Sequence, residues 1–408
     1  MSNLGDEKEL EKLLNIKLDK LEKLDILEDD PVMSQDPVPD NDLFKDIPPG
    51  KEGFEILSQS PAVNRFEEFL LKTIDETNDM PNGPPFARSI TQIAVTERTE
   101  VYKNGIQHQY DTSLKKVRDI FLRITSKNPV HNDEIIKVVD DFMSIFIKDK
   151  CILLNLVNCK CDPQYELYHH GLHVCLLCIN IAAACGYSKE QVLEIGEAGL
   201  LADIGMLHIP NDMLKKKVKL KTNELFDIQK HPIIGITLLE RVQGIPMSVP
   251  LASYQHHERL SGVGYTKNRK AHLIHAYARI VAIADVYHAL CCTRAHRRGL
   301  LPHEAINRII KMANFKLLDA TIIKSFIKYV SLFPIGSFVN LSDGRVAKTV
   351  QSYEDHMNRP LVSILTDFNG TPLPANKIFQ VDLSRNYNLK IVGAVDFKGS
   401  DEHLMDGF

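Results

Sequence analysis

Seven segments with helical periodicity follow one another between Asp111 and Tyr329, and they limit the possible folds more than any other feature of the chain. They are VRDIFLRI, EIIKVVDDFMSIFI, HHGLHVCLLCINIAAACG, KEQVLEIGEAGLLADIG, TNELFDIQKHPIIGITLLERV, AYARIVAIADVYHALCC and HEAINRIIKMAN. Short loops with Gly, Pro or Asn separate them, which is typical of compact helical bundles. We therefore expect a mainly α-helical fold class, with a helical domain over residues 131–330.

Two smaller regions flank this helical domain. Residues 51–130 combine a helical pattern, a Pro/Gly break and a β-like run from Ser89 to Tyr102, so we expect a small α/β N-terminal region. Towards the C-terminus, short β-like runs are joined by Asp-Gly and Asn-Gly pairs, which favour tight hairpin turns. We expect residues 331–408 to form a small antiparallel β module.

Residues 1–50 differ in charge from the rest of the chain. They carry 14 acidic and 6 basic side chains, whereas the other 358 residues carry 39 acidic and 43 basic ones. Leucines at roughly helical spacing between Leu10 and Leu24 predict a short amphipathic helix, and an Asp- and Pro-rich linker follows. The helix could dock a protein partner, although a tethered, partly frayed helix in a largely disordered segment is the simpler interpretation. The charge balance gives no argument for general nucleic-acid binding.

The cysteines and the apolar runs indicate a soluble protein in a reducing compartment. The eight cysteines lack the regular spacing of a secreted disulfide framework, no secretory signal pattern opens the chain, and the longest apolar stretch is too short to span a bilayer. We therefore expect a cytoplasmic protein that does not contact membranes. Cys175 and Cys178 form a C-x2-C, and Cys159 and Cys161 a C-x-C. Either pair could ligate zinc, but buried structural cysteine is the interpretation we favour.

Several histidines of the helical region stand beside carboxylates at the spacing of metal ligands. Glu166 and His170 are four residues apart, so they share one helical face. The complete set of candidate metal ligands is Glu166, His170, Asp203, His231, His256, His257 and Asp285. A single histidine on an apolar helix is more often a core residue, and Asp285 could instead form a buried salt bridge, so the hypothesis depends on the number of these groups.

Mixed imidazole and carboxylate ligands suit iron, manganese or zinc better than magnesium or calcium. Seven groups exceed the needs of one ion, so two ions bridged by a carboxylate are the natural arrangement. Two metals roughly 3.5 to 4 Å apart can activate a shared water and stabilise both the attacking and the leaving oxygen of a phosphoester. The constellation therefore predicts a binuclear centre for phosphoester chemistry.

The order of these motifs resembles that of the HD-GYP family, whose members are bacterial proteins of the HD phosphohydrolase superfamily. The resemblance runs from about Tyr165 to residue 330 and includes EAGLLADIGMLHIP, KLKTNELFDIQKHPIIGITLLERV, QHHERLSGVGYTKN and ARIVAIADVYHAL. It implies an HD-type helical bundle that hydrolyses cyclic di-GMP at a bi- or trinuclear centre, often of iron or manganese. The β-like tail is similar to the C-terminal extension of many such proteins.

The resemblance also implies roles for individual residues. The family's metal ligands fall on the same seven positions, with Asp203 as the catalytic residue that bridges the ions. Arg294 and Arg297 match positions near the phosphates, where guanidinium groups suit phosphate oxygens, although solvated surface arginines would look the same. Gly264 and Tyr265 belong to the signature loop of the substrate site.

Four departures from the family pattern bear on activity. The His-Asp dyad has become Ala202-Asp203, and the lysine that follows it has become Met206. The signature Asp-Gly-x-Gly-Tyr-Pro has become SGVGYT, and the aspartate three residues after Asp285 has become His288. His208 could in principle replace the missing imidazole, but its position five residues after Asp203 disfavours this.

These losses favour a receptor over a fast enzyme. The missing imidazole should weaken one ion, and removing a well-placed cation near developing charge typically costs about 10²- to 10³-fold in rate. We expect a degenerate metal-binding module of cyclic di-GMP signalling with little or no turnover, holding two or three divalent ions and a cyclic dinucleotide. The alternatives are an active phosphodiesterase with an altered metal centre and a catalytically dead interaction scaffold.

Overall fold

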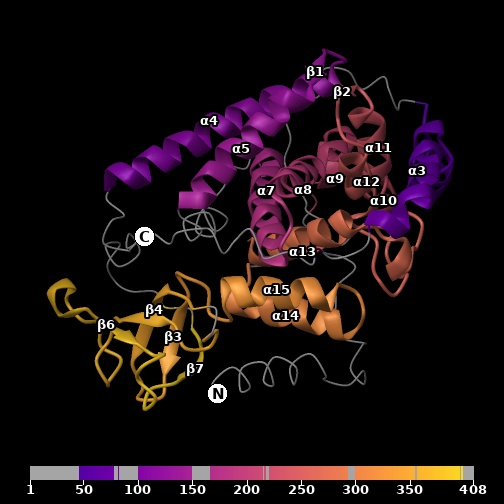
Figure 1. The fold of residues 1–408 in the computed structure, drawn as a ribbon. Helices are drawn as coiled ribbons and strands as arrows, with labels where there is room; N and C mark the ends of the chain where they lie inside the picture. The colour runs from indigo at the N-terminus through magenta and orange to yellow at the C-terminus, as the bar shows by residue number, and fades with distance from the viewer. Residues whose placement is uncertain are drawn as a thin grey trace.

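The computed structural model describes residues 46–77, 81, 100–148, 166–214, 216, 220–292, 299–353, 356–395 and 397. These residues form a helical bundle that is followed by a small antiparallel sheet at one end of the molecule (Figure 1). The mainly α-helical fold class is confirmed. The predicted amphipathic helix near the N-terminus, and the C-x-C at Cys159, lie outside the described residues.

The helices before the bundle centre are α2 (Gly50–Leu57), α3 (Pro61–Thr77), α4 (Glu100–Thr125) and α5 (Asn132–Lys148). Those of the centre are α7 (Glu166–Cys185), α8 (Lys189–Leu201), η6 (Ile204–His208), α9 (Asn211–Leu214), α10 (Thr222–Ile228), α11 (His231–Leu239), α12 (Ser248–Gln255), η7 (Ala271–Leu273) and α13 (Ala276–Cys291). Helices α14 (Pro302–Asn314) and α15 (Ala320–Val330) complete the bundle.

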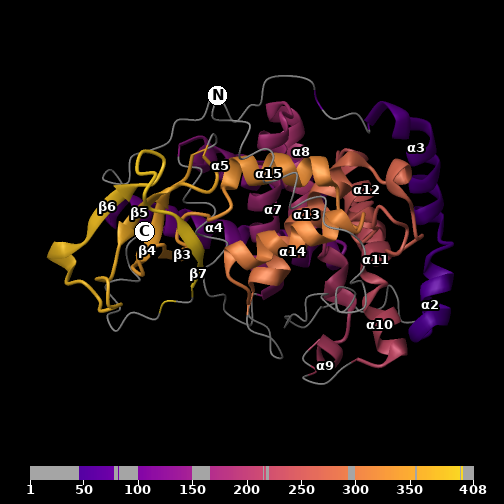
Figure 2. The same ribbon diagram turned by 90° about the horizontal axis from the view of Figure 1, so that it is seen from below.

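Helix α7 is the core of the bundle. Apolar residues lie on all of its faces, and nearly every one of its side chains is buried, as expected for a helix surrounded by others. Helices α8, α13 and α15 pack against it (Figure 2). Among the described helices, α7 is the one that is long and apolar enough to cross a membrane, and 94% of its most apolar window is buried inside the protein.

Two helices that the sequence pattern predicts as continuous are broken, and both breaks place candidate ligands. Helix α8 begins at a capping box made by Ser188 and Gln191. It ends at Leu201, four residues before its predicted end at Gly205, so that Asp203 lies in a turn between α8 and η6. The second predicted helix divides into α10 and α11, and His231 becomes the first residue of α11.

The described part of residues 51–130 is almost wholly helical. Most of the predicted β-like run lies outside the described residues, but its last three, from Glu100 to Tyr102, begin α4 instead of ending a strand. The two-residue strand β1 (Val130–His131) pairs in parallel with β2 (Val242–Gln243) and ties the end of α4 to the loop after α11.

The C-terminal module is a five-stranded antiparallel sheet with a small core of its own. Its strands are β3 (Phe338–Leu341), β4 (Val346–Gln351), β5 (Leu361–Ile364), β6 (Phe379–Asp382) and β7 (Ile391–Ala394), in the order β6-β5-β4-β3-β7. Gly344 and Gly370 have φ angles of 89° and 80°, which turns between strands demand and which glycine adopts without strain. The predicted turns therefore lie where the Asp-Gly and Asn-Gly pairs place them.

Candidate metal centre

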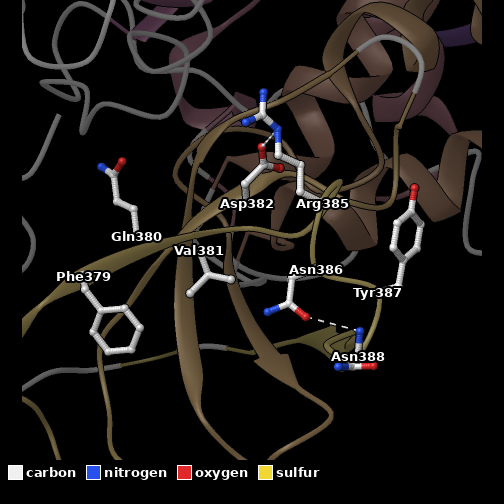
Figure 3. Close-up of a pocket in the computed structure, with 8 residues that line it drawn as sticks. All are labelled: Phe379, Gln380, Val381, Asp382, Arg385, Asn386, Tyr387 and Asn388. Atoms are coloured by element: carbon white, nitrogen blue, oxygen red, sulfur yellow. Dashed lines mark hydrogen bonds and ion pairs between the residues drawn. The ribbon is translucent and has the colours of Figure 1, made fainter.

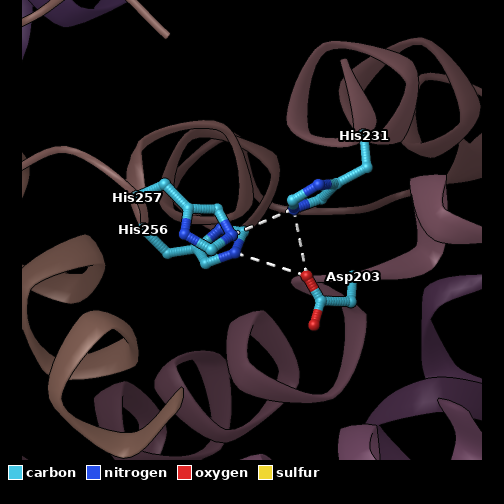
Figure 4. Close-up of side chains that lie close together, drawn as sticks. All are labelled: Asp203, His231, His256 and His257. Atoms are coloured by element: carbon cyan, nitrogen blue, oxygen red, sulfur yellow. Dashed lines mark hydrogen bonds and ion pairs between the residues drawn. The ribbon is translucent and has the colours of Figure 1, made fainter. Parts of the chain in front are cut away.

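Two groups of buried side chains that could hold metal ions share Asp203. One contains Asp203, His231, His256 and His257 (Figure 4), and the other contains His170, Asp203 and Asp285. Within each group the potential ligand atoms lie within 4.8 Å of one another. The two groups draw on the turn between α8 and η6, the starts of α7 and α11, the residues that follow α12 and the middle of α13.

The imidazoles of His231 and His256 are oriented by backbone carbonyls. Nδ1 of His231 lies 2.8 Å from the carbonyl oxygen of Ile228, and Nδ1 of His256 lies 2.5 Å from that of Ser253. A carbonyl only accepts, so both Nδ1 atoms carry a proton, and in the neutral imidazoles both Nε2 atoms carry a lone pair. These Nε2 atoms lie 3.1 and 3.4 Å from Oδ1 of Asp203. Two acceptors thus face a third acceptor, an arrangement that a cation between them would stabilise.

His257 completes the first group. Its Nε2 lies 3.1 Å from Nε2 of His231, and its ring stacks on Tyr265 with a centroid separation of 4.6 Å. Burial and the neighbouring imidazoles of His256 and His231 lower the pKa of His257 well below its usual range, so the ring is neutral. Neutral imidazole is the form that ligates metals.

The second group is built around His170. Its Nε2 lies 2.9 Å from Oδ2 of Asp203 and 3.3 Å from Oδ1 of Asp285. Burial lowers the pKa of His170, but the two carboxylates outweigh that effect and raise it to about 9. Burial raises the pKa of Asp203, but its contacts with His170, His231 and His256 hold it well below the usual range. Asp203 is therefore an ionised carboxylate in a ring of imidazoles.

The donor set fits a divalent metal. Nε2 of His170 and His256, both carboxylate oxygens of Asp203 and Oδ1 of Asp285 are buried and make no well-directed hydrogen bond among the described residues. Buried polar atoms without such bonds cost free energy, and coordination to a cation would remove that cost. Imidazole and carboxylate together favour iron, manganese or zinc.

The structure brings together six of the seven predicted ligands. Glu166, the first residue of α7, is half-buried and lies outside both groups. Arg294 and Arg297 lie outside the described residues, so their predicted contact with phosphate stays a prediction. His208, at the end of η6, is also outside both groups. Cys175 and Cys178, the C-x2-C pair, are buried in α7 as free thiols.

The altered dyad positions are buried beside the shared carboxylate. The exposed fractions of Ala202 and Met206 are 2% and 0%. The backbone carbonyl of Ala202 accepts a hydrogen bond of 2.9 Å from the hydroxyl of Ser253 on α12, which ties the turn before Asp203 to the helix that ends at His256. Apolar side chains thus stand at both positions where the HD-GYP resemblance implies a polar group.

The signature loop packs tightly against the ligand pair that precedes it. A Cβ atom on Gly264 would lie 2.4 Å from the carbonyl oxygen of His257, so a glycine is required for this close approach. The carboxylate of Glu258 accepts hydrogen bonds from the backbone N–H groups of Lys267 and Arg269 at 2.7 and 2.8 Å. The loop is thereby fixed next to the first ligand group, with Tyr265 stacked on His257.

The sequence motifs did not reveal the groups behind His170. There the hydroxyl of Tyr110 on α4 lies 2.8 Å from Nε2 of His173 on α7, whose Nδ1 lies 2.9 Å from Nε2 of His288. In the sequence, His288 stands out only as a departure from the family pattern. Two further histidines on one α7 face, His169 and His173, were the available signal, but α4 comes near them only through tertiary packing.

A separate hollow of about 710 Å³ lies on the C-terminal module, on the outer side of β6 and the turn that follows (Figure 3). It is lined by Phe379, Gln380, Val381, Asp382, Arg385, Asn386, Tyr387 and Asn388. None of these residues is a predicted site residue, and the hollow contains no group of metal ligands.

Comparison with known proteins agrees with the motifs. Residues 138–322 match the family described as HD domain, and residues 338–402 match a KOW domain associated with HD domains. A cyclic di-GMP phosphodiesterase of Pseudomonas aeruginosa is 30% identical over 272 residues, which are 65% of this chain and 64% of that protein. A 3′3′-cGAMP-specific phosphodiesterase of Vibrio cholerae is 33% identical over 169 residues, 41% of this chain and 37% of that protein.

The chain thus spans less than two thirds of the length of either relative. Among solved structures, an HDG"Y"P protein from Bdellovibrio bacteriovorus is similar with a TM-score of 0.45 at 18% identity, over 64% of this chain and 78% of that chain. The two domain matches and the phosphodiesterase relatives confirm the resemblance that the motifs predicted. Residues 138–322 therefore belong to the HD-domain family, and the phosphodiesterase relatives support the HD-GYP resemblance of the motifs.

Proposed function

We propose that this protein is a cytoplasmic receptor for a cyclic dinucleotide, that it binds the ligand at a metal centre on Asp203, and that its turnover is slow or absent. One observation carries the proposal. Oδ1 of Asp203 faces the imidazoles of His231 and His256, whereas Oδ2 faces His170. A carboxylate with different imidazoles on its two oxygens is suited to bridge two ions.

The first ion would be held by Asp203 and the imidazoles of His231, His256 and His257. The second would be held by His170, Asp203 and Asp285. When bound, such a pair of divalent ions supplies charge stabilisation and an activated water at a phosphoester. The protein's own contribution is to fix the imidazole tautomers through carbonyls and to keep Asp203 ionised.

The two ion sites are unequal, which supports the receptor proposal. The first has four donors and the second has three, and the imidazole that the HD-GYP resemblance implies at Ala202 is missing. At position 206 the same resemblance implies a lysine whose positive charge lies near the phosphate, and this chain has an uncharged methionine there. Loss of one such donor costs about 10²- to 10³-fold in rate, and a poorly held ion adds to that loss.

Cyclic dinucleotides are the proposed ligand class because the relatives are named for them. The names include cyclic di-GMP and 3′3′-cGAMP, which share a ring closed by phosphodiester bonds. Arg294 and Arg297 are proposed to contact these phosphates. The Tyr265 ring, already ordered by stacking on His257, is proposed to line the ligand site with Gly264.

Metal content and turnover measured on one sample test the proposal. Protein purified anaerobically with added manganese or iron should hold stoichiometric metal and bind cyclic di-GMP, with little linear dinucleotide or GMP released. Stoichiometric metal and ligand binding without product support the receptor. Product that forms in the wild type but not in Asp203→Ala would instead establish an active phosphodiesterase. The complete four-donor group is the observation that favours this alternative. Absence of both metal and nucleotide binding would leave the scaffold alternative.

A further inference from the structure

A continuous chain of hydrogen-bonding side chains leads from α4 to the back of His170. Nδ1 of His170 lies 2.9 Å from Nδ1 of His288, and Nε2 of His288 lies 2.9 Å from Nδ1 of His173. Nε2 of His173 lies 2.8 Å from the hydroxyl of Tyr110, which lies 2.7 Å from Nδ1 of His169. The chain thus joins helices α13, α7 and α4.

This series of hydrogen-bonded side chains is buried along its whole length. The exposed fractions are 3% for Tyr110, 0% for His173, 3% for His288 and 8% for His169. Bulk water therefore does not compete for these hydrogen bonds, and each group depends on its neighbours for a partner. Sγ of Cys292 also lies 3.1 Å from Nε2 of His288, where a thiol can share the same N–H as a weak second acceptor.

The chemistry of the imidazoles and of the tyrosine hydroxyl gives the series of hydrogen bonds a single direction of donation. A neutral imidazole donates through one nitrogen and accepts through the other, so the direction chosen at one end is imposed on every link. If Nδ1 of His170 donates to His288, then Nε2 of His288 donates to His173, and Nε2 of His173 donates to Tyr110. The hydroxyl of Tyr110 then donates to His169. Every contact is then satisfied, with one ring proton each on His288 and His173.

We propose that Tyr110, His173 and His288 form a relay that holds the ring proton of His170 on Nδ1 and so leaves the Nε2 lone pair for the second ion. This inference rests on the proposed metal centre, and the three residues are positioning residues. The opposite direction would place the proton of a neutral His170 on Nε2, where it would face Asp203 and Asp285 and block coordination.

The histidine at position 288 explains why the relay reaches beyond its first link. A carboxylate, which the HD-GYP resemblance implies there, could accept the proton of His170 but has no proton to donate to His173. His288 does both, and its ring packs edge-on against both His170 and His173, with centroids 4.8 and 5.0 Å apart. The metal centre is thereby connected to α4, which forms no part of either ligand group.

The direction of the relay can be read from tautomers in the full-length protein. In protein labelled with ¹⁵N-histidine, long-range ¹H–¹⁵N spectra distinguish Nδ1–H from Nε2–H, and signals are assigned by substituting single histidines. The relay requires His173 and His288 to be Nε2–H tautomers, with and without added Zn²⁺. Nδ1–H tautomers at both positions in the zinc-loaded protein would overturn it.

Substitutions at His288 separate positioning from simple packing. His288→Leu removes the acceptor and should weaken Zn²⁺ binding at the second ion about 10- to 100-fold, the usual effect of losing a partner of a metal-binding histidine. His288→Asp restores the acceptor and should restore the affinity, while the tautomer of His173 is no longer imposed. A folded His288→Leu protein with wild-type affinity for both ions would overturn the proposal.

Tyr110→Phe tests the outer end of the relay far from the ligands. In this variant both neutral tautomers of His173 and of His288 should be populated. The affinity for Zn²⁺ should fall, but by less than in His288→Leu. Tyr168→Phe is the matched control, because Tyr168 is equally buried and packs edge-on against Phe121 outside the relay. It should leave tautomers and affinity unchanged. One further outcome separates the two proposals. If His173 and His288 are Nε2–H tautomers but the wild-type protein binds no Zn²⁺, the proposed function and the metal role of the relay are refuted, whereas the direction of its hydrogen bonds is confirmed.

Discussion

Oδ1 of Asp203 lies 3.1 Å from Nε2 of His231, and the Nδ1 proton of that ring is committed to the carbonyl of Ile228. In the neutral ring, the Nε2 lone pair therefore faces an ionised carboxylate oxygen inside the protein, with no proton to separate them. The contact is favourable only if a cation is held between the two atoms.

Because Asp203 belongs to both ligand groups, neutralising it should affect both ions. Asp203→Asn keeps the shape of the side chain but removes the charge, and we expect metal content to fall at both sites. Asp285→Asn touches only the three-donor group, so it should remove one ion and leave the other. Elemental analysis of the three proteins after identical purification checks this. Equal metal loss in the two variants would contradict a bridging role for Asp203.

Restoring the two polar groups of the dyad should restore activity if their loss explains slow turnover. Ala202→His with Met206→Lys is expected to raise metal content and hydrolysis of cyclic di-GMP together. Met206→Lys alone should instead lower stability, because Met206 is fully buried and an unpaired ammonium there is costly. Product release and metal content are measured for both single variants and the double variant. No gain in either quantity for the double variant would refute our account of the altered dyad.

Gly205 sets the distance between Asp203 and the start of α11. A Cβ atom on Gly205 would lie 2.0 Å from the carbonyl oxygen of His231 and 2.7 Å from the backbone nitrogen of Gly235. Gly205→Ala must push η6 away from α11, so it should destabilise the protein by roughly 1 to 3 kcal/mol, as overpacking does, and reduce metal content.

Gly105→Ala is the opposite case and serves as the control. Gly105 is exposed on α4, and nothing lies within 4 Å of the position of its added Cβ. Alanine there should stabilise the helix by roughly 0.5 to 1 kcal/mol without changing metal content. Urea unfolding and elemental analysis check both variants. A Gly205→Ala protein as stable and as metal-rich as wild type would show that the helices can separate freely.

How far the sequence predicts this structure differs between residues. Most candidate ligands were predictable because each lies in a recognisable motif, and His170 and Asp285 lie in helices that the sequence pattern predicts. Helix α12, which ends just before His256, was not among the predicted helices. The exact end of α8 at Leu201 was not predicted, since the pattern stays apolar up to Ala202. The break before His231 was also not predicted, although Pro232 favours the first turn of a new helix there. The role of Tyr110 was also hidden, because only tertiary packing brings α4 to α7.

Glu197 gives the protein a pH-dependent stability that can be tested apart from the metal centre. The residue is fully buried in α8, and burial raises the pKa of its carboxyl to about 8 from an ordinary value of 4.5. Between about pH 5 and 8 the folded state keeps a proton that the unfolded state has lost. Stability should therefore fall as pH rises through this window, by up to about 1.4 kcal/mol for each pH unit.

Glu197→Gln removes the titrating group while keeping its size. The free energy of unfolding of the variant minus that of wild type should therefore increase between pH 5 and 8 and level off above about pH 8. Urea unfolding at several pH values, with metal removed from all samples, measures this difference. Glu52→Gln, at an exposed position of α2, is the matched control and should give a small, constant difference. A constant difference for Glu197→Gln as well would show that Glu197 is already ionised in the folded protein, in spite of its burial.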